Sequence, residues 1–167
     1  MPHPVRPPVR RATAADTDEL IRLRIVMLEA MEAGPVAPGD WSHRSAVALR
    51  RRLPDPDATL AAFVVDRPDG SPGLAACAVG TIEERLGAPG NPDGRLGYVF
   101  NVATDGPYRR QGLSTACLEA LLAWFTERDV PTVRLFATQD GLAVYERLGF
   151  TRETNTSMRL NLPRRVS

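Results

Sequence analysis

Lysine is absent from this chain, and all 21 basic residues are arginine. A chain without lysine has no Schiff-base lysine and no P-loop lysine, so both of these chemistries are excluded. The formal net charge is only +1, which gives the whole molecule no electrostatic bias toward DNA or a membrane surface. The preference for arginine, together with many alanines, prolines and glycines, is typical of a GC-rich bacterial genome.

Cysteine and histidine are also scarce, with two residues of each. Cys77 and Cys117 lie in apolar runs, which predicts two reduced thiols in the core. His3 lies in a proline-rich tail and His43 in a polar helix, and neither has a partner at the spacing of metal ligands. We therefore expect no metal site.

Long apolar runs are missing as well. No segment approaches the ~18 consecutive apolar residues of a membrane span, and the first ten residues lack the apolar stretch of a secretory signal. The default expectation is a cytoplasmic protein. With 167 residues, 43% of them hydrophobic, the chain has the size and composition of one globular domain. We place this domain at 9–162, between a flexible tail over 1–8 and a short tail over 163–167.

Hydrophobic periodicity and turn residues predict six strands and four helices. The strands are expected at 9–13, 59–66, 74–83, 98–104, 131–137 and 156–160, and the helices at 14–33, 41–53, 112–128 and 141–148. Residues 98–137 read as one strand-helix-strand unit with parallel strands, whereas the hairpins before it are antiparallel. The predicted fold is therefore an α/β domain, with a mixed sheet and helices on its faces.

The turn TDGPYRRQGLST, residues 104–115, carries most of the chemistry. It leads from a strand into a helix, and a helix N-terminus offers unpaired N–H groups and a positive dipole end to a phosphate. Gly112 allows close backbone approach, Ser114 and Thr115 add hydroxyls, and Arg109 and Arg110 add charge. Neither a Walker loop nor a GxGxxG fingerprint is present. The alternative is a surface turn with two solvated arginines.

Two runs of residues resemble a known family. The run YVFNVATDGPYRRQGLSTACLEALL, 98–122, is similar to the acetyl-CoA-binding motif of the GNAT superfamily of N-acetyltransferases. Its signature R/Q-x-x-G-x-G/A begins at Arg109 and is matched at Gly112, and Ser114 keeps a small residue in place of the last Gly/Ala. The run LFATQDGLAVYERLGF, 135–150, resembles the second family landmark, a helix that carries a tyrosine, Tyr145, and ends in Gly-Phe. The resemblance covers nearly the whole chain.

The resemblance implies a GNAT-like fold, in which a twisted mixed sheet is splayed between its fourth and fifth strands and flanked by about four helices. A bulge is implied at 102–104. Acetyl-CoA would place its pyrophosphate on the amides of 110–115 and its pantetheine arm along the splayed strand, where a backbone N–H near Val102 polarises the thioester. The implied cofactor-binding residues are Val102, Ala103, Thr104, Arg109, Arg110, Gln111, Gly112, Leu113, Ser114, Thr115 and Thr138, the last in place of a frequent asparagine.

The implied activity is acetyl transfer from acetyl-CoA to the primary amine of a small molecule, by direct attack in a ternary complex. A neutral tyrosine, with a pKa near ~10, can protonate the departing thiolate of a thiol with a pKa near ~8.5, so Tyr145 is expected to be the general acid. Its alternative is simple packing. Gly97 stands where some members place a glutamate base, so that base cannot be assumed here. Glu83 or Glu84 is a candidate instead, because both end the third strand, next to the central strand. Water or an already neutral amine would serve instead.

The sequence says least about which residues bind the acceptor. In this family the loop between the first two helices often forms the acceptor wall, which would place Glu29, Glu32 and Trp41 near the substrate; surface solvation and packing are the alternatives. A catalytically silent acyl-CoA-binding module and an acetyltransferase for protein or peptide amines remain competing functions. Nucleic acid is not an expected partner. Dimers are common in the superfamily, so a homodimer is compatible with the resemblance.

Overall fold

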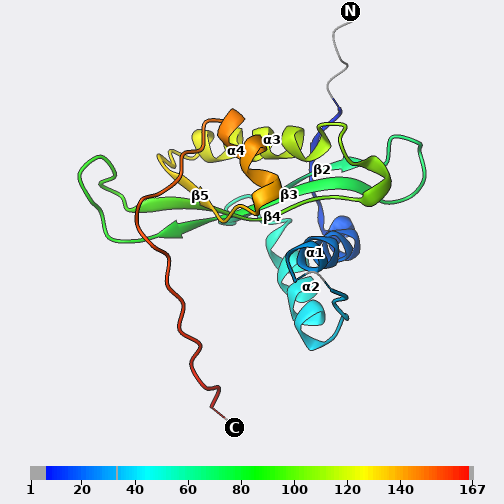
Figure 1. The fold of residues 1–167 in the computed structure, drawn as a ribbon, viewed down its shortest axis with the longest axis horizontal. Helices are drawn as coiled ribbons and strands as arrows, with labels where there is room; N and C mark the ends of the chain where they lie inside the picture. Colours follow the sequence, from blue (N-terminus) through cyan, green and yellow to red (C-terminus); the bar gives the residue numbers. More distant parts are fainter. Residues whose placement is uncertain (1–6, 33, 166–167) are drawn as a thin grey trace, which may run out of the picture.

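The protein, described by a computed structural model over residues 7–32 and 34–165, is built on one five-stranded sheet with the order β1-β2-β3-β4-β5. Helix α3 covers one face, and α1 and α2 cover the other (Figure 1). The mixed sheet with flanking helices confirms the predicted fold class. The strands are β1 (Arg10–Arg11), β2 (Leu60–Asp66), β3 (Leu74–Glu84), β4 (Arg95–Thr104) and β5 (Val133–Leu135); the helices are α1 (Thr17–Glu32), α2 (Asp40–Arg52), α3 (Leu113–Glu127) and α4 (Leu142–Arg147).

The core lies on both faces of β2 and β3, because helices cover the sheet on each side. Both strands are accordingly apolar at almost every position rather than at alternate ones. Between the sheet and α3, Leu121 and Phe125 are fully buried, and between the sheet and α1 the same is true of Leu23. Cys77 and Cys117 are free thiols with no exposed surface, one in each core layer.

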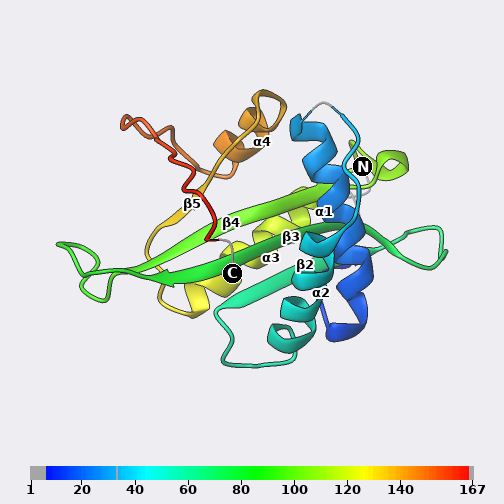
Figure 2. The same cartoon turned by 90° about the horizontal axis from the view of Figure 1, so that it is seen from below.

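Strand β4 separates from β5 soon after the two strands meet. The parallel pairing covers only Gly97–Val99 against Val133–Leu135, whereas β4 continues to Thr104 beside β3. Beyond Val99, no described strand pairs with the other edge of β4. Figure 2 shows α4 and the chain leading to it set apart from β4. The predicted splay between the fourth and fifth strands is therefore confirmed.

The bulge that accompanies this splay lies upstream of the predicted position at 102–104. Gly80 pairs with Val99 and Val79 with Asn101, so Phe100 is the extra residue of β4. Phe100 packs against the core layer beneath α1. Asn101 lies toward the same layer, where its Nδ2 donates to Cys77 Sγ at 3.5 Å. The bulge sits at Phe100 because α1 accepts two consecutive β4 side chains there.

The strand predicted at 156–160 does not form, which is a correction to the sequence interpretation. This segment runs away from the sheet with no strand beside it (Figure 1). Met158 is 92% exposed and Leu160 81% exposed. Alternating apolar residues form a strand only where a neighbouring strand satisfies their backbone hydrogen bonds, and within the described residues β5 has β4 as its single partner.

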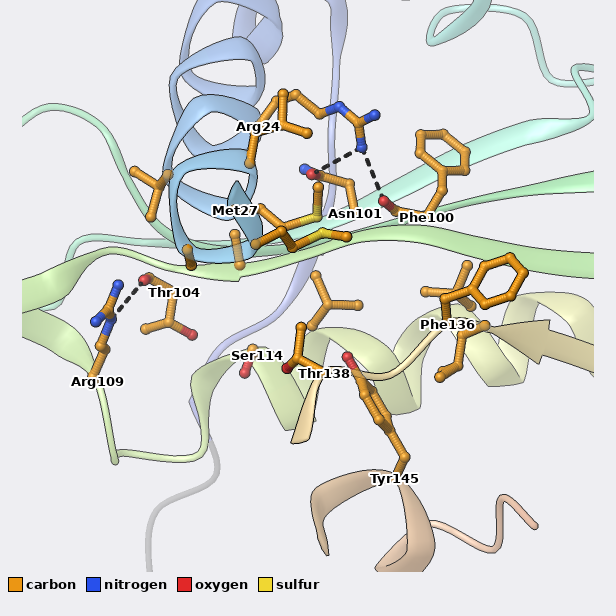
Figure 3. Close-up of a pocket in the computed structure, with 18 of the residues that line it drawn as sticks. Arg24, Met27, Phe100, Asn101, Thr104, Arg109, Ser114, Phe136, Thr138 and Tyr145 are labelled. Atoms are coloured by element: carbon orange, nitrogen blue, oxygen red, sulfur yellow. Dashed lines mark hydrogen bonds between the residues drawn. The ribbon is translucent and has the colours of Figure 1, made fainter. Parts of the chain in front are cut away.

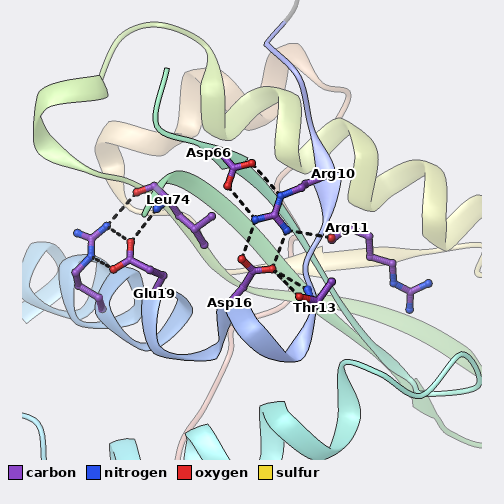
Figure 4. Close-up of polar contacts among 8 residues, drawn as sticks. Arg10, Arg11, Thr13, Asp16, Glu19, Asp66 and Leu74 are labelled. Atoms are coloured by element: carbon purple, nitrogen blue, oxygen red, sulfur yellow. Dashed lines mark hydrogen bonds and ion pairs between the residues drawn. The ribbon is translucent and has the colours of Figure 1, made fainter. Parts of the chain in front are cut away.

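The first segment is also shorter than expected, because a charged cluster ends it early (Figure 4). Strand β1 spans two residues, and a 3₁₀ turn (Ala14–Asp16) precedes α1. Arg10 Nη1 and Nη2 each donate to an oxygen of Asp16 at 2.8 Å, while its Nε and Nη2 reach Asp66 at 3.0 and 2.9 Å. The turn is therefore fastened to the end of β2.

Some sequence predictions fall on residues that the structure does not describe. His3 and most of the expected tail over 1–8 lie outside the described residues, as do the end of the first predicted helix at residue 33 and residues 166–167 of the expected tail over 163–167.

None of the helices in the described part of the chain is both long and apolar enough to cross a membrane. Within 7–32 and 34–165, no three His, Cys, Asp or Glu side chains form a group that could hold a metal ion.

Candidate active site

A cavity of about 640 Å³ opens where β4 and β5 diverge. Residues of α1, β4, β5, the turn before α3 and α4 line it (Figure 3). In the close-up, β4 runs through the middle, with Arg24 and Met27 of α1 on one side and Ser114, Thr138 and Tyr145 on the other. The cavity thus has two chemically different sides, which we call the α1 mouth and the α3 mouth after the helices beside them.

The turn before α3 has the backbone of an anion-binding site. Arg110 and Gly112 have positive φ angles of 63° and 73°, and Gly112 is the N-cap of α3. No side chain caps this helix, and its first backbone bond runs from Ala116 N to Gly112 O at 3.0 Å. The amides of Leu113, Ser114 and Thr115 therefore lack intrahelical acceptors, and their N–H groups coincide with the positive end of the helix dipole.

Three polar contacts hold this turn in place. Asp105 N donates to Ala75 O at 2.8 Å, and the Asp105 carboxylate pairs with Arg22 at 3.1 Å. Tyr108 donates its hydroxyl hydrogen to Asp69 at 2.7 Å. The turn is thereby attached to β3, to α1 and to the β2–β3 loop. A cradle fixed in this way needs little reorganisation to receive an anion.

The side chains of the turn complete the site. Arg109 and Arg110 are exposed and line the cavity together with Ser114. Arg109 Nε donates to Thr104 O at 3.4 Å, at the end of β4. Among the other cofactor-binding residues predicted, Val102, Ala103, Thr104 and Thr138 also line the cavity. The other predicted cofactor-binding residues are not among those that line the cavity: Gln111 and Gly112 lie in the turn beside it, and Leu113 and Thr115 lie in the first turn of α3.

Tyr145 of α4 reaches into the cavity from the side opposite α1 (Figure 3). Its ring meets Phe150 edge to face, with 5.9 Å between centroids. A Cβ at Gly141 would lie 2.9 Å from the same ring, so glycine leaves the room that the tyrosine occupies. Burial raises the pKa of the phenol above its usual value. No hydrogen-bond partner for its hydroxyl is found among the described residues, and a phenol with a raised pKa is uncharged at neutral pH.

The two candidate bases lie away from the cavity wall. Glu83 pairs with Arg85 at 2.8 Å, and Glu84 is exposed at the last position of β3. Among the described residues that line the cavity there is no Asp, Glu or His. Gly97 has a packing role in this protein, because a Cβ there would lie 2.9 Å from the Phe125 ring.

Glu29, Glu32 and Trp41 lie around the α1–α2 loop and are not among the residues that line the cavity. Glu29 Oε1 accepts a hydrogen bond from Val36 N at 3.1 Å, and Trp41 Nε1 donates to Ala37 O at 3.1 Å. Glu32 is exposed. In this structure, Glu29 and Trp41 thus make contacts that shape the loop.

The α1 mouth is lined by residues that the sequence interpretation did not single out. They are mostly large and apolar, with one arginine among them: Arg24, Met27, Met31, Phe100 and Phe136. The sequence did contain a signal that could have identified Arg24. This arginine directly follows Leu23, beside the apolar side of a helix that continues to Met27. An arginine bordering an apolar stripe is costly to bury without a purpose.

Comparison with known proteins agrees with this geometry. The model of the acetyltransferase (GNAT) family matches residues 27–150, which include the α3 turn and Tyr145. The chain belongs to the GNAT acetyltransferase family. GNAT acetyltransferases act on amine acceptors. No match is found among curated proteins.

Solved GNAT structures share the fold over nearly the full chain. A predicted acetyltransferase from Clostridium acetobutylicum, crystallised with acetyl-CoA, is 23% identical with a TM-score of 0.76, covering 92% of this chain and 95% of that one. A GCN5-related N-acetyltransferase from Ralstonia eutropha is 24% identical with a TM-score of 0.70, covering 92% and 97%. Glucosamine-6-phosphate N-acetyltransferase from Arabidopsis thaliana is 16% identical with a TM-score of 0.71, also covering 92% and 97%.

Proposed function

We propose that this GNAT protein transfers an acetyl group from acetyl-CoA to the primary amine of a small molecule, by direct attack within a ternary complex. The observation that carries the proposal is a single cavity whose wall includes the side chains of the anion-binding turn and Tyr145. The Clostridium protein with the same fold was crystallised with acetyl-CoA, which supports the same donor here.

The donor would enter from the α3 side of the sheet. The uncapped amides of Leu113, Ser114 and Thr115 suit the pyrophosphate, with Arg109 and Arg110 balancing its charge. The edge of β4 beyond Val99 offers backbone groups without a strand partner, and the amide-bearing pantetheine arm can pair with them as an added strand. A β4 amide near Val102 would then polarise the thioester carbonyl.

The acyl transfer step supplies one proton to the departing sulfur and releases one from the amine. The amine nitrogen attacks the thioester carbonyl carbon, the carbon–sulfur bond breaks, and the sulfur leaves with the electron pair. Tyr145 gives its phenolic proton to that sulfur, since a tyrosine is protonated at neutral pH and can donate to the thiolate as it forms. The proton released from the amine restores the phenol through solvent. The sequence-based proposal of Glu83 or Glu84 as base has less support, and a neutral amine fits the carboxylate-free wall better.

An amine panel tests the proposal. Each amine is mixed with the full chain and acetyl-CoA, and free thiol and acetylated amine are measured together. Equal release of both establishes transfer. CoA binding without either product would instead favour the catalytically silent acyl-CoA-binding module, and turnover confined to peptide amines would favour the protein-modifying alternative.

A further inference from the structure

Arg24 is a cation in the α1 mouth of the cavity with no carboxylate beside it. Its guanidinium is partly buried, and Nη1 donates to Phe100 O at 2.9 Å and to Asn101 Oδ1 at 3.5 Å. The ring of Phe100 lies 5.9 Å from its Cζ. Within the described part of the chain, no group accepts from its Nε or Nη2, and no carboxylate lies within ion-pair distance.

Two other partly buried arginines are paired with acids. Arg10 contacts Asp16 and Asp66, and Arg22 contacts Glu19 and Asp105. Arg95 and Arg128 are partly buried without an acid, but they donate to backbone carbonyls and do not line the cavity. Arg24 instead loses hydration with no compensating charge, and its burial lowers the pKa of the guanidinium. Moving a charge out of water without a partner is unfavourable, so the position is best explained by a partner that arrives with a ligand.

The ligand group that would pair with Arg24 is distinct from the CoA phosphates. The other two cations of the cavity wall, Arg109 and Arg110, belong to the turn before α3. Figure 3 places Arg24 across β4 from Ser114, Thr138 and Tyr145. The donor pyrophosphate would therefore be held at one mouth, whereas Arg24 faces whatever enters from the other.

The remaining surroundings of Arg24 narrow the chemistry further. Met27 and Met31 follow it along α1, one and two turns later, and Phe136 lines the opposite wall beside β5. Met31 is 52% exposed and Phe136 68% exposed, although both are large and apolar. A ligand with an apolar body would cover them. A single guanidinium edge with two parallel N–H donors, Nε and Nη2, matches the two oxygens of one carboxylate.

We propose that Arg24 binds a carboxylate of the acceptor, so that the acceptor is a small amine carrying both a carboxylate and an apolar body, as an apolar amino acid does. This inference rests on the proposed acetyl transfer to an amine and names its substrate class. Arg24 is a binding and specificity residue in this arrangement, because Nε and Nη2 pair with the carboxylate while Nη1 stays on Phe100 O.

Matched probes test the proposal by binding, without turnover. Leucine and isoamylamine share an apolar body and an amine but differ in the carboxylate. Phosphoethanolamine carries an amine and a phosphate, with neither a carboxylate nor an apolar body. Calorimetry with the full chain, free and saturated with CoA, should show leucine binding about 10- to 100-fold more tightly than isoamylamine, the range expected for charge-assisted hydrogen bonds. Equal affinity, no binding of either, or tighter binding of phosphoethanolamine would overturn it.

Variants separate ligand binding from a purely structural clamp. Arg24→Gln removes the charge and the paired donors but keeps a polar side chain, and we expect the preference for leucine to disappear while isoamylamine affinity is unchanged. Arg24→Lys should retain part of the preference, because charge remains without the paired donors. Arg44→Gln, at an exposed arginine of α2, is the matched control. Equal weakening of both probes in Arg24→Gln would assign Arg24 a structural role only. A wild-type chain that does not bind CoA would instead contradict the proposed function.

Discussion

At the level of single residues, the structure gives more specific roles to Gly112 and Tyr145 than the sequence motifs do. Gly112 has a φ of 73° at the N-cap of α3, and a Cβ added there would meet nothing within 4 Å. Its importance is thus conformational, together with the space it leaves above the helix N-terminus. Gly141 and Gly97, by contrast, are small because aromatic rings occupy the adjacent space.

Replacing Gly112 with valine should weaken CoA binding by roughly tenfold or more. A non-glycine residue pays about 1–2 kcal/mol to hold a left-handed conformation, and a β-branched side chain would also project toward the phosphate. Isothermal titration with CoA measures the effect. Gly106→Ala, in the same turn and with nothing within 4 Å of its Cβ, is the control, and an unchanged affinity in Gly112→Val would remove the phosphate-cradle assignment.

Replacing Tyr145 with phenylalanine should lower kcat by about 10²-fold, the lower end of general acid catalysis, with CoA affinity almost unchanged. The ring and its contact with Phe150 are retained, so the variant removes only the hydroxyl. Steady-state kinetics with a saturating amine, alongside CoA titration, separate the two effects. An unaltered kcat would show that Tyr145 is a packing residue.

At the level of elements, the hydrophobic stripe of α1 serves two purposes along its length. Leu20 and Leu23, near the beginning, are buried against the sheet, whereas Met27 and Met31, further along, line the cavity. The helix therefore has to be held at a fixed angle to β4. The Arg10–Asp16 contact does this at the start of the helix, where it joins the turn before α1 to β1 and β2.

Asp16→Asn should lower the free energy of unfolding by about 1.5–3 kcal/mol, the usual contribution of hydrogen bonds to charged groups. Arg10 holds the pKa of the Asp16 carboxyl below its usual value, so the wild type gains this stability above about pH 4, the ordinary range of an aspartate. The gain is lost as the pH falls through the lowered pKa. Urea titrations between pH 3 and 7, chosen around that range, should show a shallower acid dependence in the variant; identical profiles would contradict this role.

At the level of the whole molecule, the C-terminal segment leaves apolar side chains unburied. Met158, Leu160 and Leu162 alternate with polar residues, and each is at least 77% exposed. A groove of about 580 Å³ lies between β5, α4 and the chain that follows α4. Exposed apolar surface of this kind is characteristic of interaction sites, and every copy of the chain carries both the segment and the groove.

We therefore predict a homodimer, the assembly that the family resemblance allows, with the C-terminal segment covered by a second copy. Light scattering on a size-exclusion column measures the mass of the full chain and of a variant with Met158, Leu160 and Leu162 changed to serine. The full chain should be dimeric and the variant monomeric. A monomeric full chain, or an equally dimeric variant, would contradict the prediction.

The sequence alone determined most of the secondary structure, the mixed sheet and the turn before α3, because periodicity, turn residues and the Arg109–Ser114 motif are local properties of the chain. The fate of residues 156–160 was not local. Their alternation is compatible with a strand, but a strand forms only with a neighbour, and that neighbour is set by tertiary structure.

The tertiary structure also decided the position of the bulge and the character of the cavity. The bulge falls at Phe100 because α1 accommodates two successive β4 side chains. Arg24 and Tyr145 are 121 residues apart in the sequence (145 − 24) yet line one cavity, since the splay of β4 from β5 opens the sheet between their helices. Local patterns specify which groups a chain can offer; only packing specifies which of them face one another.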